Sequence, residues 1–176
     1  MLFTQTPLDD AVFVGHHGKP ENYPFIEDYD DLLFYIQRNQ NLNSVVYEVN
    51  LLPGNLLNLT QPIKIHWLKY NEDASTEKHA LNVIQQKLAY GYQHRTITNE
   101  LIEFRFVSYE EMKFYIAKNE NARFRVFSVI DGVNIEILSM YIYAEDFGVF
   151  PQVKFVEFFG KNTCTADIFY KKLILE

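Results

Sequence analysis

The clearest pattern in the chain lies between Arg123 and Tyr143, which reads RFRVFSVIDGVNIEILSMYIY. Two runs rich in β-branched and aromatic residues flank the dipeptide Asp131-Gly132. This dipeptide tolerates the positive φ angles of a type I′ turn, which matches the twist of two paired strands. The pattern therefore predicts a long antiparallel hairpin, around which we expect the rest of the chain to be organised.

Short apolar runs separated by polar turns recur through the rest of the sequence and predict further strands. In Ile63–Tyr70, the apolar residues Ile63, Ile65 and Trp67 alternate with polar ones. Such a two-residue period is typical of a strand with one buried face. The other predicted strands are Leu32–Arg38, Val45–Leu52, Leu101–Ser108, Lys113–Ala117, Gln152–Gly160 and Ala166–Ile174.

One stretch carries a helical period instead. Apolar residues recur at helical spacing through Leu81–Leu88, and either Asp73 or Ser75 can serve as the N-cap before them. Gly91 then supplies a left-handed stop. The sequence therefore predicts a helix near residues 75–91, which covers an open end or a face of the sheet.

Neighbouring strands joined by short turns pair mostly antiparallel. About nine such strands must close on themselves or stack as two sheets, because an open sheet leaves unpaired edges. We expect a mainly β fold, an antiparallel meander forming a barrel or strongly curved, calycin-like sheet with one packed α-helix. A two-sheet β-sandwich is the alternative. Residues 1–31 are expected to form an irregular arm, and residues 32–176 a single β domain.

The composition supports a packed domain and excludes some partners. The chain has 176 residues, of which 48% are hydrophobic and 16% aromatic, enough for a sizeable core. A net charge of -7 argues against nucleic acid, because phosphate contacts need concentrated Lys and Arg. We see no membrane-spanning run and no signal peptide. The location is therefore cytoplasmic as the sequence is written, or periplasmic or secreted if a leader was removed.

Familiar catalytic signatures are missing: the sequence contains no GxSxG, HExxH or GxGxxG. The single cysteine, Cys164, cannot form an internal disulfide, and we interpret it as a small residue near a turn. Adjacent His16 and His17 would point to opposite faces of a strand, and the acidic cluster Asp28–Asp31 lacks the pattern of a calcium loop. We expect no metal, cofactor or catalytic residue, which favours a non-enzymatic role.

Glu157 is the most unusual residue, because it interrupts an apolar row that contains Phe155 and Phe159. A buried carboxylate needs a cation or hydrogen-bond donors, and Arg38, Arg105 or Arg125 could supply the cation. One interpretation is a barrel interior with a charged end that holds a small amphiphilic ligand. The alternative is an outward face or a structural ion pair. The candidate ligand-binding residues are Arg38, Tyr47, Trp67, Phe104, Arg105 and Glu157.

A resemblance adds to this interpretation. The phrases LFYIQRN, NSVVYEVN, QQKLAYGY, EFRFVSY and VKFVEFFGK, in this order, resemble an uncharacterised bacterial family, domain of unknown function 4833. The resemblance covers roughly Leu32 to Tyr170. It implies a bacterial single-domain protein in a family of which some members carry secretory leaders. It implies no activity, ligand or catalytic residue.

Two functions from different classes are compatible with the sequence. The first is a non-enzymatic binding protein for a small apolar or amphiphilic ligand, which predicts an internal cavity lined by aromatic residues. The second is a protein-interaction or scaffold module that uses a strand edge or an aromatic surface patch. It predicts a filled core and an exposed apolar patch.

Overall fold

The fold is almost entirely β. The computed structural model describes residues 23–39, 41–147 and 150–175. Strands account for 65% of the structure and helix for 4%. The elements are β1 (Leu32–Arg38), β2 (Asn41–Val49), β3 (Leu51–Leu52), β4 (Leu56–Leu57), β5 (Ile63–Tyr70), β6 (Thr76–Ala80), α2 (Val83–Leu88), β7 (Tyr92–Thr98), β8 (Leu101–Phe106), β9 (Tyr109–Lys118), β10 (Phe124–Ile130), β11 (Val133–Phe147), β12 (Phe150–Asn162) and β13 (Ile168–Ile174).

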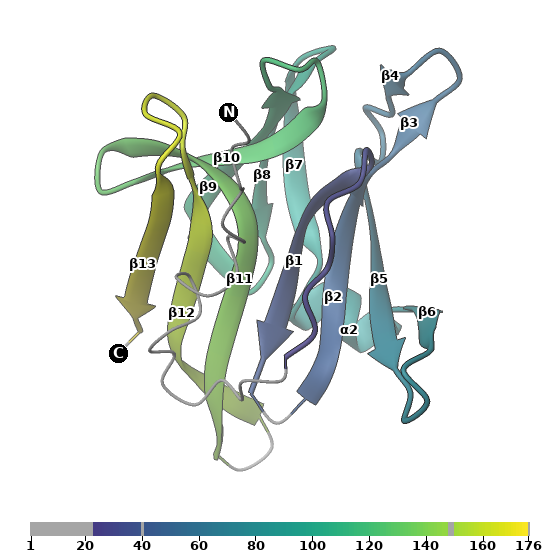
Figure 1. Ribbon diagram of the computed structural model, residues 1–176, viewed down its shortest axis with the longest axis vertical. Coiled ribbons are helices and arrows are strands. Elements are labelled where there is room, and N and C mark those ends of the chain that lie inside the picture. The colour runs from purple at the N-terminus through teal and green to yellow at the C-terminus, as the bar shows by residue number, and fades with distance from the viewer. Residues whose placement is uncertain (1–22, 40, 148–149, 176) are drawn as a thin grey trace, which may run out of the picture.

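The long strand β11 is the centre of the sheet, because it pairs along both edges. One edge pairs antiparallel with β10 through Val133–Ile137 and then parallel with β1 through Ser139–Ile142. The other edge pairs with β12, which in turn pairs with β13. Figure 1 shows β12 and β13 on one side of β11, and β1, β2 and β5 on the other. The predicted hairpin is confirmed, with Asp131 and Gly132 at φ values of 51° and 77°.

Two wings of the sheet diverge from β11. The first runs β1-β2-β5-β6 and the second runs β10-β9-β8-β7. The path of nine strands curls through 217° as a half-barrel, which confirms the predicted curved sheet. The last strand of the second wing, β7, is joined to β5 of the first wing by Tyr92. Its hydroxyl accepts a hydrogen bond from Ile63 N and donates one to Ile63 O, both at 3.1 Å.

The inner faces of the two wings enclose an aromatic core. Phe34 of β1 stacks on Tyr47 of β2 with ring centroids 4.3 Å apart, and Phe104 of β8 stacks on Phe114 of β9 at 5.3 Å. Phe34 and Phe104 are 6.4 Å apart, so the wings meet ring to ring. Each buried ring of this kind contributes roughly 1.5–3 kcal/mol. The core therefore holds the two wings in their curved arrangement.

The helix starts later than the sequence predicts. Residues Thr76–Ala80, which the prediction placed in the helix, form strand β6 instead. The N-cap of α2 is Asn82, rather than Asp73 or Ser75. Asn82 Oδ1 accepts a hydrogen bond from Gln85 N at 2.8 Å, and Gln85 Oε1 accepts one from Asn82 N at 3.0 Å. This capping box fixes the first turn of the helix at this later position.

The apolar face of α2 also differs from the prediction. Leu81 is 4% exposed, but it precedes the helix, whereas Ile84 and Leu88 are 68% and 61% exposed. Gly91 does not adopt a left-handed conformation. A glycine is required there because a Cβ atom would lie 1.8 Å from the carbonyl oxygen of Gln86. The helix therefore has fewer than two turns and no buried residue of its own, and its apolar residues face solvent.

The described part of the arm, residues 23–31, crosses the outer face of the first wing. Gln37 Nε2 donates a hydrogen bond to Pro24 O at 2.6 Å, and the Tyr29 hydroxyl donates to Glu48 at 2.7 Å. In Figure 1 this segment runs alongside β1 and β2. The predicted His16-His17 pair lies outside the described residues. Where the structure describes the chain, no helix has the length and apolar character needed to cross a membrane.

Candidate functional site

Three of the six predicted ligand-binding residues lie in the core. Tyr47 and Phe104 are 0% and 1% exposed, and both belong to the aromatic core. The Tyr47 hydroxyl donates a hydrogen bond to Tyr90 O at 2.8 Å. Trp67 Nε1 donates to Gln85 Oε1 at 3.2 Å. These three side chains therefore pack the half-barrel and satisfy their own polar atoms.

The three charged candidates lie apart from one another. Arg105 Nη2 is 3.5 Å from Glu103, and its side chain is 39% exposed. Arg38 is half-buried at the end of β1. Glu157 is fully buried and accepts a hydrogen bond from the Tyr170 hydroxyl at 2.7 Å. None of the six predicted residues lines the pockets described below. Their part in ligand binding stays a prediction.

A pocket of about 200 Å³ lies on the outer face of the sheet, where β1, β10, β11 and β12 meet. The arm forms one of its walls. We call this space the outer pocket, and its lining is mostly apolar. The apolar wall includes Ile26, Leu32, Tyr35, Leu138 and Phe159, and the polar end is formed by Asp28, Arg125, Glu136 and Lys161.

The outer pocket exists because β11 changes its partner at this point. The register between β11 and β12 shifts between Ile137 and Ser139, which leaves Leu138 at an irregularity beside the pocket. Such bulges bend a strand and redirect its side chains. On β12, Gly160 lets the two strands approach, since a Cβ atom there would lie 2.2 Å from Glu136 O. β1 and β10 diverge from this junction, and the pocket lies between them.

Arg125 closes the polar end of the outer pocket and is 3% exposed. Its Nη1 donates hydrogen bonds to Leu32 O at 2.8 Å and to Phe124 O at 3.0 Å. Its Nη2 donates to Asp28 at 2.8 Å, and its Nε lies 3.4 Å from Glu136. A buried guanidinium is tolerated only when its donors have partners. The local geometry therefore fixes this charge firmly in place.

Glu136 gives the polar end a perturbed carboxyl group. Burial raises the pKa of Glu136, the Asp28 carboxylate adds to the effect, and Arg125 and Lys161 oppose it. A perturbed carboxyl group beside an apolar pocket is typical of functional sites. Asp28, from the acidic cluster of the arm, pairs with Arg125 and with Arg123 at 3.0 Å. The described residues contain no group of three or more His, Cys, Asp or Glu side chains that could hold a metal ion.

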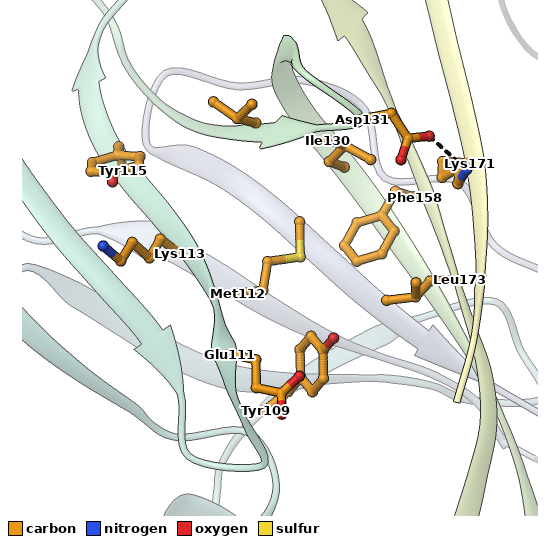
Figure 2. A pocket seen from close by; sticks show the side chains of 11 residues that line it. Tyr109, Glu111, Met112, Lys113, Tyr115, Ile130, Asp131, Phe158, Lys171 and Leu173 are labelled. Carbon is orange, nitrogen blue, oxygen red and sulfur yellow. Dashed lines mark hydrogen bonds and ion pairs between the residues drawn. The ribbon is translucent and has the colours of Figure 1, made fainter. Parts of the chain in front are cut away.

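A second space, which we call the inner groove, lies between β9 and β13 and measures about 490 Å³. Figure 2 shows Met112, Phe158 and Leu173 converging along it, with Asp131 and Lys171 joined at its rim. Lys171 Nζ lies 2.6 Å from Asp131. The inner groove is more open than the outer pocket, and its charges lie at the rim. It is therefore the weaker candidate for a small ligand.

Of the charged residues of the outer pocket, sequence reasoning named Asp28 and Arg125, but assigned neither to it. The signal for Arg125 was its position inside the apolar strand β10. Leu138, Glu136 and Lys161 were missed. The sequence around these residues gives no signal for a pocket, because they come together only where β11 changes its pairing from β10 to β1.

The comparison with known proteins gives a family. A family model described as "Domain of unknown function (DUF4833)" matches residues 34–172. The chain therefore belongs to this family, as the sequence phrases indicated. No curated protein and no solved structure matches the chain. The family description gives no activity, so a function has to be argued from the site itself.

Proposed function

We propose that this member of the DUF4833 family is a non-enzymatic binding protein that holds a small amphiphilic molecule in the outer pocket. One observation carries the proposal: mostly apolar walls end on the buried guanidinium of Arg125 and the half-buried carboxyl group of Glu136. Small-molecule sites are typically concave and mostly apolar, with a few fixed polar groups that orient the ligand.

The volume of the outer pocket limits the ligand. The pocket of about 200 Å³ is roughly seven times the ~30 Å³ that a water molecule takes in the liquid, so it accommodates an apolar group of about seven non-hydrogen atoms. It is smaller than the ~300–1,000 Å³ of sites for drug-sized molecules. A short alkyl chain or a single ring fits this space, whereas a long lipid chain exceeds it.

The polar end of the outer pocket supports binding because it is already organised. Arg125 keeps its hydrogen bonds to Leu32 O and Phe124 O and its pair with Asp28 in the structure. These contacts tie β1, β10 and the arm together around the pocket. A ligand therefore does not have to order the charged groups when it binds, and this lowers the entropic cost of binding.

A ligand titration with a filled-pocket variant tests the proposed function. We expect eight-carbon amphiphiles to raise the thermal stability of the protein and to shift backbone amide signals around the outer pocket. Ligand at about 100 times its Kd stabilises a protein by roughly 2.7 kcal/mol. Leu138→Trp should place an indole in the pocket and abolish both effects.

Leu173→Trp is the matched control, because Leu173 lines the inner groove and not the outer pocket. This variant should bind as the wild type does. Amide shifts confined to Met112 and its neighbours, or undiminished binding by Leu138→Trp, would count against the outer pocket as the binding site.

A protein-interaction module is the second candidate function. One observation favours it: Val83, Ile84 and Leu88 of α2 are 64%, 68% and 61% exposed. Exposed apolar clusters often mark interaction surfaces, and a second copy of the chain is the simplest partner. Sedimentation should then show self-association that Ile84→Lys removes. A wild-type chain that stays monomeric at high concentration would contradict this candidate.

A further inference from the structure

At its charged end, the outer pocket adjoins a larger space. This polar cleft measures about 1020 Å³ and lies between the turn after β9 and the turn that joins β12 to β13. It is bordered by residues from Lys118–Arg123 on one side and from Asn162–Ala166 on the other. Both spaces are lined by Asp28, Arg125, Glu136, Lys161 and Ile168. A molecule in the outer pocket can therefore extend a polar group into the cleft.

The charges at this boundary are not all paired. Arg125 is saturated by the contacts described above, and Arg123 lies 3.0 Å from Asp28 and 3.3 Å from Asp30. Lys161 differs, because within the described residues its ammonium group makes no hydrogen bond and no ion pair, and it attracts the Glu136 carboxylate only from beyond ion-pair distance. Lys161 is thus a cation at the mouth of an apolar pocket whose charge is available to a ligand.

We propose that the ligand is a short-chain carboxylate, with its alkyl chain in the outer pocket and its carboxylate group against Lys161 at the edge of the polar cleft. This inference rests on the proposed function and gives the ligand class. An alkyl chain of about seven carbons matches the volume of the outer pocket. Octanoate has such a chain and is the probe of choice.

The surrounding charges favour a carboxylate over other head groups. The carboxylates of Asp28 and Glu136 both pair with Arg125, whereas the ammonium donors of Lys161 have no acceptor within the described residues, and a ligand carboxylate supplies one. An ammonium group would meet the same lysine and be repelled by it. An alcohol would form only a neutral hydrogen bond, which is weaker than one between two charged groups.

The wall of the polar cleft is held by its own hydrogen bonds. Asn162 Oδ1 accepts hydrogen bonds from Cys164 N at 2.8 Å and from Thr165 N at 3.3 Å. Thr163 N donates to Asn134 O at 3.0 Å. The turn that follows Lys161 therefore has a defined shape, and this fixes the backbone from which the lysine extends.

Calorimetric titration of the full chain with three ligands of equal length tests the inference. Octanoate should bind the wild type at least about tenfold more tightly than 1-octanol, and octylamine should bind weakest. Lys161→Met keeps the apolar stem and removes the charge. It should lower the octanoate affinity about tenfold, to that of 1-octanol, and leave the 1-octanol affinity unchanged.

Lys171→Met is the matched control, because Lys171 pairs with Asp131 at the inner groove. It should bind all three ligands as the wild type does. Equal binding of octanoate and 1-octanol, or undiminished octanoate binding by Lys161→Met, would overturn the carboxylate inference and leave the proposed function standing. Binding of none of the three ligands would overturn both.

Discussion

The outer pocket and the inner groove show two ways in which one sheet forms a hollow. The outer pocket lies where β11 exchanges β10 for β1, and at its polar end Arg125 is buried and paired with Asp28 and Glu136. The inner groove lies between β9 and β13, and its ion pair is partly exposed, with Lys171 at 39% and Asp131 at 64%. A buried charge is costly unless its partners are in place, whereas a rim charge is screened by water.

We therefore expect the outer pocket to depend on a few residues that tolerate little substitution, and the inner groove to tolerate more. Arg125 and Gly160 fix the geometry of the outer pocket. No comparable constraint acts on the described side chains at the rim of the inner groove. Substitutions in the two regions should therefore have very different effects on the free energy of unfolding.

The largest loss in the free energy of unfolding is expected for Arg125→Met. This change removes a buried cation that binds Glu136, Asp28 and the carbonyl of Leu32, and only Asp28 keeps a second cation, Arg123. Removal of one partner from a buried charge pair costs about 3–5 kcal/mol. Urea unfolding measures the loss. Lys171→Met is the control, because both partners of its ion pair are partly exposed, Lys171 at 39% and Asp131 at 64%, and such a pair is worth about 0–1 kcal/mol. Similar losses for both variants would remove the contrast between buried and rim charges.

The next largest loss in the free energy of unfolding is expected for Gly160→Ala. The new Cβ atom would lie 2.2 Å from Glu136 O and 2.7 Å from Ile135 Cγ2. Forcing an extra group into a packed site typically costs about 1–3 kcal/mol. Unfolding measurements should show this loss, and amide signals of β11 and β12 should shift. Unchanged stability and spectra would mean that β12 does not need its close approach to β11.

A smaller change in stability, which depends on pH, is expected for Glu136→Gln. Because burial raises the pKa of Glu136, the folded state favours the protonated form. The stability that this proton contributes is present below the unfolded pKa and is lost as pH rises through the folded pKa. The variant should therefore gain thermal stability relative to the wild type as the pH rises from the unfolded pKa of a glutamate, about 4.3, through the higher folded pKa. A gain that is largest at low pH would contradict the direction of the shift.

The smallest effect is expected for Lys171→Ala at the inner groove. Its ion pair with Asp131 is partly exposed, so its loss should cost about 0.2–1 kcal/mol. The same unfolding assay measures it, ideally with and without added salt. A loss as large as that of Arg125→Met would show that the inner groove is as constrained as the outer pocket.

Much of the fold could be predicted because its central strands alternate cleanly. The bounds of β1 and β5 agree with the predicted ranges, and the Asp131-Gly132 turn is where the pattern places it. β6 and β7 were missed because they are edge strands with polar residues on both faces, so the two-residue period is absent. The helical period around Ile84 misled the prediction, since that face is exposed.

The candidate site could be predicted only in part. Arg125 was recognisable as a charge within an apolar strand that would need partners, but those partners come from distant segments. Its contact with Asp28 joins residues 97 positions apart. Leu138 enters the outer pocket because of a register shift, which depends on three strands at once. Local spacing carries no information about such a change of partner.

The parallel pairing of β1 with β11 has a consequence for how the chain is made. Asn39 Nδ2 donates a hydrogen bond to Ala144 O, 105 residues later. During translation, β1 and β2 leave the ribosome long before β11 has been synthesised. Until then, the edge of β1 that pairs with β11 has unpaired backbone groups and can pair with a strand of another chain. Contacts between such distant segments also slow folding. We therefore expect a chaperone to be needed to cover this edge of β1 in the nascent chain until β11 has been translated.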